Sequence, residues 1–183
     1  MTLIRLQGCN LRCPFCDTPD ALDPEGGTTK TIQQILNELQ GIHKIGRAIL
    51  LTGGEPAMQD LTTLVSVLRM VGPVHLETNG TLPLDPETRL SWTTVSPKKD
   101  YKVDSVTLGM CDEIKWLVGC EQDIEELHKF IVEANKVIPL FPFKQICLQP
   151  ISQSEASTKL AYDACLAHGW RLSLQLHRYI GVR

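Results

Sequence analysis

The chain alternates short apolar segments typical of β-strands with segments in which apolar residues recur at helical spacing. The strand-like segments are residues 2–7, 48–51, 74–78, 93–96, 113–118, 145–149 and 171–176. The helix-like segments are residues 31–42, 61–68, 124–134 and 155–168. Strands joined through helices run parallel with right-handed crossovers, so this order predicts an α/β protein with a parallel sheet.

The alternation of strands and helices is incomplete in the middle of the chain. No amphipathic segment of about ten residues or more separates the strands expected at 74–78, 93–96 and 113–118. We therefore expect fewer helices than strands, arranged as an open, strongly curved sheet or partial β/α barrel. The sequence contains no linker-like or low-complexity tract, which predicts a single domain over residues 1–183.

Charge and hydropathy exclude several classes of protein. The 183 residues include 18 Lys and Arg against 21 Asp and Glu, a net charge of −3, so no large basic surface is available for direct nucleic-acid binding. No apolar run approaches the roughly 20 residues of a membrane span, and the N-terminus lacks the pattern of a secretory signal. These features predict a cytoplasmic protein without membrane partners.

Seven cysteines, an odd number, make a complete disulfide framework improbable in a chain without a secretory signal. Three of them crowd one loop with the spacing C-x3-C-x2-C: Cys9, Cys13 and Cys16. The other four lie in apolar or strand-like segments and are interpreted as buried core residues: Cys111, Cys120, Cys147 and Cys165.

Three thiols in so short a loop suit a metal centre better than disulfides. A structural zinc site takes four ligands, yet no second C-x2-C pair exists and the nearest histidine is His43. A 4Fe-4S cluster held by three cysteines leaves one iron open to bind another molecule. The spacing favours the iron-sulfur cluster, with zinc as the alternative.

Every other polar motif also follows a predicted strand. The motifs are TGGEP at residues 52–56, ETNG at 77–80, SPKK at 96–99 and QPIS at 149–152. The carboxyl ends of parallel strands gather at one rim of a sheet, so we expect these motifs to meet the cysteine loop around one pocket.

The segments 8–18 (GCNLRCPFCDT) and 52–56 together resemble the radical S-adenosylmethionine (SAM) enzymes. Within that superfamily, further motifs are similar to the 7-carboxy-7-deazaguanine synthases of queuosine biosynthesis: residues 77–81, 96–98, 149–151 and 177–179. The resemblance implies a pared-down version of the superfamily's partial barrel, which accounts for the missing middle helices.

The resemblance also implies a set of cofactor sites. Cys9, Cys13 and Cys16 would hold the 4Fe-4S cluster, whose open iron would bind the methionine end of SAM. The other matching positions for SAM are Phe15, Asp17, Gly53, Gly54, Glu55, Ser96, Lys98 and Gln149. Among them, the glycine pair lets the backbone approach SAM closely, and Glu55 would accept hydrogen bonds from its ammonium group.

For the substrate, the resemblance implies contacts of a carboxylated pterin with Arg5 and Thr52 and a Mg²⁺ ion bound by Thr18. The implied reaction contracts the ring of 6-carboxy-5,6,7,8-tetrahydropterin to 7-carboxy-7-deazaguanine with loss of ammonia, while SAM is regenerated. An electron donor such as flavodoxin would supply the reducing electron, and a homodimer is a possible assembly.

Two alternatives and one departure accompany this hypothesis. The family usually has a segment with a Gly-Glu-Gly loop before the position of Arg5, which this sequence does not show before Met1. A shortened start, a different substrate clamp or a changed function would each account for that departure. The alternative functions are a radical SAM activase that makes a glycyl radical on a partner protein, and a non-catalytic zinc or iron-sulfur module.

Overall fold

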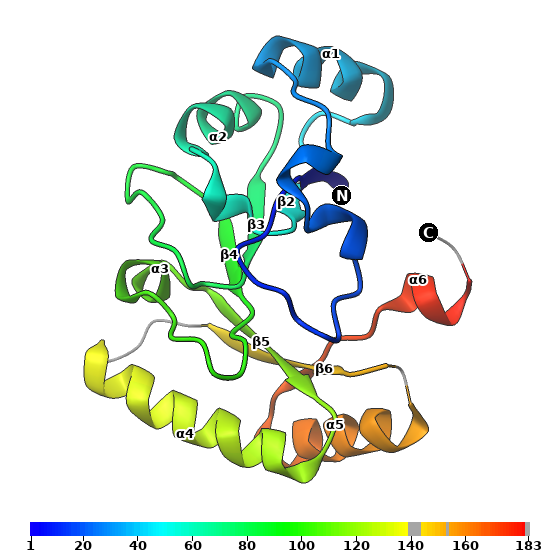
Figure 1. Cartoon of the computed structure of the whole chain (residues 1–183), viewed down its shortest axis with the longest axis vertical. Coiled ribbons are helices and arrows are strands. Elements are labelled where there is room, and N and C mark those ends of the chain that lie inside the picture. Colours follow the sequence, from blue (N-terminus) through cyan, green and yellow to red (C-terminus); the bar gives the residue numbers. More distant parts are fainter. Residues whose placement is uncertain (139–143, 153, 182–183) are drawn as a thin grey trace.

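The computed structural model describes residues 1–138, 144–152 and 154–181 and contains one seven-stranded sheet (Figure 1). All neighbouring strands are parallel, and their order in the sheet follows the chain from β1 to β7. The strands are β1 (Thr2–Leu6), β2 (Ile49–Gly53), β3 (Val74–Thr78), β4 (Trp92–Val95), β5 (Glu113–Val118), β6 (Gln145–Pro150) and β7 (Arg171–Leu172). The predicted parallel α/β sheet is confirmed.

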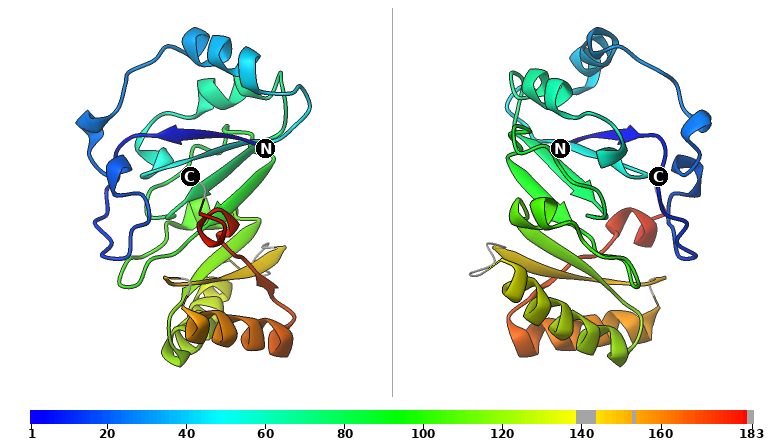
Figure 2. Two further views of the ribbon diagram at one scale, coloured as in Figure 1. Left: turned by 90° about the vertical axis from the view of Figure 1, so that its right-hand side faces the viewer. Right: turned by 60° about the vertical axis from the view of Figure 1, so that its left-hand side comes forward.

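Fewer α-helices than strands accompany the sheet, as expected. They are α1 (Ile32–Ile42), α2 (Thr62–Leu68), α3 (Ser105–Gly109), α4 (Glu121–Val137), α5 (Glu155–His168) and α6 (Leu176–Tyr179). The sheet curves strongly, with α1 and α2 over one part of its outer face and α4 and α5 over the other (Figure 2). Among the described residues β1 and β7 do not pair, so the barrel is open.

Helix ends follow the signals in the sequence. Thr31 and Gln34 form a reciprocal capping box at the start of α1, where the Thr31 side chain accepts from the Gln34 N–H. At the end of α5, Gly169 takes the left-handed conformation with φ +70°, which a glycine adopts without steric cost.

The hydrophobic core lies on the convex side of the sheet, between strands and helices. Ile49 and Leu51 of β2 are fully buried against α1 and α2, while Ile114 and Val118 of β5 pack with α4 and α5. Because side chains alternate along a strand, the residues between them face the concave side. That face carries polar side chains and is left for the pocket described below.

Three expectations are corrected by the structure. The last strand ends at Leu172, and α6 begins at Leu176, inside the segment predicted as strand. The short helix α3 lies between β4 and β5, where no helix was expected, because five residues are too few to show helical periodicity. Cys120 is exposed at the N-cap of α4, whereas Cys111, Cys147 and Cys165 are buried as predicted.

None of the helices in the described part of the chain combines the length and the apolar character that a bilayer crossing requires.

Candidate functional site

A pocket of about 430 Å³ opens where the strands end, between the cysteine loop and the loops that follow β2 to β6. It is lined by eleven residues that the sequence singled out: Cys9, Cys13, Phe15, Cys16, Asp17, Thr52, Gly53, Gly54, Ser96, Lys98 and Gln149. The expected gathering of motifs at one rim of the sheet is therefore what the structure contains.

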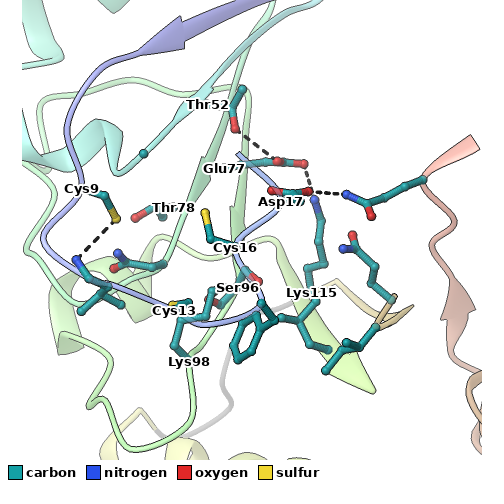
Figure 3. A pocket seen from close by; sticks show the side chains of 18 of the residues that line it. Cys9, Cys13, Cys16, Asp17, Thr52, Glu77, Thr78, Ser96, Lys98 and Lys115 are labelled. Carbon is teal, nitrogen blue, oxygen red and sulfur yellow. Dashed lines mark hydrogen bonds and ion pairs between the residues drawn. The ribbon is translucent and has the colours of Figure 1, made fainter. Parts of the chain in front are cut away.

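The three clustered thiols come from the loop between β1 and the first 3-10 turn, Pro19–Ala21. Figure 3 shows the side chains of Cys9, Cys13 and Cys16 around the same space. Burial raises the pKa of Cys13, the neighbouring thiols Cys9 and Cys16 raise it further, and the ammonium of Lys98 opposes the rise. Within the described residues, no three His, Cys, Asp or Glu side chains are grouped so as to hold a single metal ion.

The glycine pair after β2 allows two backbone segments to touch. Gly53 has φ +144°, and a Cβ atom there would lie 2.0 Å from the carbonyl oxygen of Leu6. A Cβ atom on Gly54 would lie 2.1 Å from the carbonyl oxygen of Gly8. The end of β2 is thus pressed against the start of the cysteine loop, and a side chain at either position would separate them.

Glu55 lies behind the pocket wall and not on its surface. The residue is 0% exposed, and its Oε1 accepts hydrogen bonds from the Thr78 hydroxyl at 2.6 Å and the Ala57 N–H at 2.9 Å. Oε2 accepts from the Asn79 N–H at 2.6 Å. Burial raises the pKa of Glu55 although these three donors favour its ionised form. The carboxylate therefore fixes the end of β3, whose residues Thr78 and Asn79 line the pocket.

Lys98 places its ammonium group at the pocket from the loop after β4. It donates to the Ser96 hydroxyl at 2.7 Å, and burial lowers the pKa of Lys98 to about 8. The cysteine thiols are close enough to oppose that shift when ionised, and Lys115 adds to it. Bound thiolates would accordingly keep Lys98 protonated.

Arg5 and Thr18 lie beside the pocket and are not part of its lining. The Arg5 guanidinium donates to the Thr18 hydroxyl at 3.3 Å, and Arg5 is the register partner of the pocket residue Thr52. The three positions expected to serve substrate and Mg²⁺ are therefore neighbours. The side chains of His177 and Arg178 are outside the described residues.

Three further polar residues line the pocket without having been assigned a role from the sequence: Glu77, Lys115 and Gln175. Lys115 forms an ion pair with Glu77, which also accepts a hydrogen bond from the Thr52 hydroxyl at 3.4 Å (Figure 3). The alternation of β5 around the buried Ile114 is the signal that could have placed Lys115 on the concave face. Gln175 donates to Asp17 from the segment after β7, and no local pattern marks it.

Thiol reactivity at about pH 8 should separate the loop cysteines from the buried ones. The cluster-free protein should show four fast-reacting thiols, from the partly exposed Cys9, Cys13 and Cys16 and the exposed Cys120. Burial raises the pKa of Cys111 to about 12 and that of Cys147 to about 11, which leaves little thiolate to react.

Occupation of the loop by a metal cluster should reduce the four fast thiols to one. Alkylation followed by peptide mass spectrometry measures this, and the remaining fast site should be Cys120. If Cys111 were labelled as fast as Cys120, the described burial would be wrong.

The chain was compared with known proteins once the site was defined. The model of the radical SAM superfamily matches residues 3–110. The 7-carboxy-7-deazaguanine synthase of Escherichia coli strain K12 is 34% identical over 204 residues, which covers 98% of this chain and 88% of that protein. The protein of the same name from Bacteroides thetaiotaomicron is 37% identical over 182 residues, covering 98% and 86%.

Solved structures show the same relationship. The crystal structure of QueE from Escherichia coli superposes with a TM-score of 0.78 at 32% identity, covering 94% of this chain and 84% of that one. SuiB from Streptococcus suis, solved with its precursor peptide SuiA, superposes with a TM-score of 0.57 at 14% identity, covering 95% and 48%. The likeness to SuiB concerns the fold alone.

Proposed function

Because the chain belongs to the radical SAM superfamily, and within it to the 7-carboxy-7-deazaguanine synthases, we propose that it converts 6-carboxy-5,6,7,8-tetrahydropterin to 7-carboxy-7-deazaguanine. The proposed reaction is a radical ring contraction that releases ammonia. The observation that carries the proposal is 34% identity to a named synthase over 98% of the chain, with the matching motifs around one pocket.

The residues present fit the 4Fe-4S cluster that the family implies. Three thiols from one loop reach the pocket wall, which is the donor set of a cluster with one open iron. When bound, the cluster supplies the electron that cleaves SAM to a 5′-deoxyadenosyl radical. Cys9, Cys13 and Cys16 would hold it, with Lys98 as the neighbouring positive charge.

The proposed SAM site is formed mainly by the loops after β2, β4 and β6. The bare backbone at Gly53 and Gly54 admits the methionine end, while Ser96, Lys98 and Gln149 provide polar groups across the pocket. Phe15 and Asp17 would flank the adenine side from the cysteine loop. Glu55 would act indirectly by fixing Thr78 and Asn79, because its own oxygens are fully buried.

The proposed pterin site lies on the concave face beside β1 and β2. Arg5 would bind the substrate carboxylate through its guanidinium group, and Thr52 would contact the ring from the pocket wall. Thr18, within hydrogen-bonding distance of Arg5, is the proposed protein ligand for Mg²⁺. The ion would keep most of its waters and orient the carboxylate.

Turnover tests the proposal directly. The anaerobically reconstituted protein, with SAM, Mg²⁺, a reductant and 6-carboxytetrahydropterin, should release ammonia together with a deazapurine of the expected mass. A brown protein with about four irons per chain but no turnover would favour the glycyl radical activase. Colourless protein with stoichiometric zinc would favour the non-catalytic module.

Replacing Arg5 with Ala should weaken pterin use without affecting the cluster. Loss of one charge-assisted contact predicts an increase in the pterin KM of about tenfold or more, because such bonds contribute about 1.5 to 3 kcal/mol. Steady-state kinetics gives the KM, and iron content with visible absorbance reports the cluster. The matched control is Arg89→Ala, an exposed arginine that precedes β4 at the opposite end of the strands. An unchanged KM in Arg5→Ala would remove Arg5 from the substrate site.

A further inference from the structure

The segment from Asn10 to Cys16 carries two of the three loop thiols and is held to the fold at one polar point. Within residues 1–138, 144–152 and 154–181, each hydrogen bond that joins it to another part of the fold comes from the Asn10 side chain. Other bonds close within the loop, such as those from Arg12 to the carbonyl oxygens of Cys9 and Leu11. Leu11, 5% exposed, adds an apolar contact.

Asn10 is bound on both sides of its amide by the loop after β3. Its Oδ1 accepts from the Asn79 side-chain amide at 3.0 Å, and its Nδ2 donates to the Thr81 hydroxyl at 2.8 Å. Asn79 Oδ1 in turn accepts from the Thr81 N–H at 2.8 Å and from the Thr81 hydroxyl at 2.7 Å. The three side chains form a closed set of hydrogen bonds between two loops.

Asn79 itself is fixed to the rigid part of the fold. Its N–H donates to the fully buried Glu55, and Asn79 is 7% exposed. The next residue, Gly80, has φ +78°, and a Cβ atom there would lie 2.7 Å from a methyl group of Val95. The carbonyl oxygen of Gly80 accepts from the Asp104 N–H at 2.8 Å. The Asn79 side chain therefore projects from an anchored backbone toward the cysteine loop.

We propose that Asn79 is a positioning residue that holds the cysteine loop, through Asn10, in the shape that binds the cluster. Asn10 directly follows Cys9 and precedes Cys13 by three residues, so its position sets the spacing of the first two thiols. A loop that is already ordered loses less conformational entropy when its thiols bind. The inference rests on the proposed role of these cysteines as cluster ligands.

The test measures how fast the reconstituted cluster is lost to an iron chelator, followed by visible absorbance. Asn79→Ala and Asn10→Ala should each accelerate the loss about tenfold, the lower end of what removal of a residue that orients metal ligands costs. Because both variants break the same contact, the double variant should lose its cluster no faster than either single variant.

Two controls separate positioning from general destabilisation. Asn135→Ala removes an asparagine that bonds the Ile131 carbonyl within α4, and it should keep the rate of the unmodified protein. Hydrogen exchange of the cluster-free protein should speed up in peptides covering residues 10–16 for Asn79→Ala, with the β2 and β5 peptides unchanged.

The outcomes are distinguishable. Loss rates within twofold of the unmodified protein, or rates that multiply in the double variant, would contradict the positioning role. An unmodified protein that assembles no cluster would instead overturn the proposed function. In that case hydrogen exchange still decides whether Asn79 orders the loop.

Discussion

Cys13→Ala should abolish the iron-sulfur cluster and all SAM cleavage together. Cys13 lies between the other two thiols in the loop, and its removal leaves two protein ligands where three are needed to retain a cluster with one open iron. The side chain is only partly buried, so the fold should survive the loss of one sulfur atom. We expect colourless protein after reconstitution, no signal from a reduced cluster in electron paramagnetic resonance, and no 5′-deoxyadenosine.

Cys120→Ala is the matched control, because Cys120 is exposed at the start of α4 and does not line the pocket. It should keep the colour, the iron content and the turnover of the unmodified protein. If Cys13→Ala retained about four irons and Cys120→Ala lost them, the assignment of ligands to the loop would be wrong.

Local patterns in the sequence were sufficient to predict the order of strands and helices and most of the pocket. The cysteine loop and the glycine pair are recognisable because their chemistry depends on spacing within a few residues. Their meeting in space followed from one rule, that the carboxyl ends of parallel strands share a rim. The capping box at Thr31 was predictable for the same local reason.

The features that escaped prediction depend on contacts between distant segments. Lys115 reaches the pocket because Ile114 and Trp116 on either side of it face the core, and the ion pair with Glu77 joins two strands of the sheet. Glu55 was expected to touch SAM, yet three donors from the loops after β2 and β3 hold its carboxylate inside the wall. Neither arrangement leaves a trace in the spacing of residues.

Gly53→Ala should destabilise the cluster-free fold by about 3 kcal/mol or more, because it combines backbone strain with overpacking. At φ +144° a Cβ atom is disfavoured whatever the space around it, and here that atom would lie 2.0 Å from the Leu6 carbonyl oxygen and 2.6 Å from its nitrogen. Both neighbours are backbone atoms of β1, so relief requires the strand itself to move. Denaturant unfolding of the cluster-free protein measures the loss.

The same substitution should also move the cysteine loop, because β1 leads directly into it and Gly54 donates its N–H to the Leu6 carbonyl at 3.1 Å. Gly41→Ala provides the contrast: Gly41 lies within α1, and a Cβ atom there meets nothing within 4 Å. Alanine should stabilise that helix by about 0.5 to 1 kcal/mol. A Gly53→Ala protein as stable as Gly41→Ala would mean that β1 and β2 do not meet as described. The pocket would then have a different wall, since the close approach of these strands brings the glycine pair to the thiols.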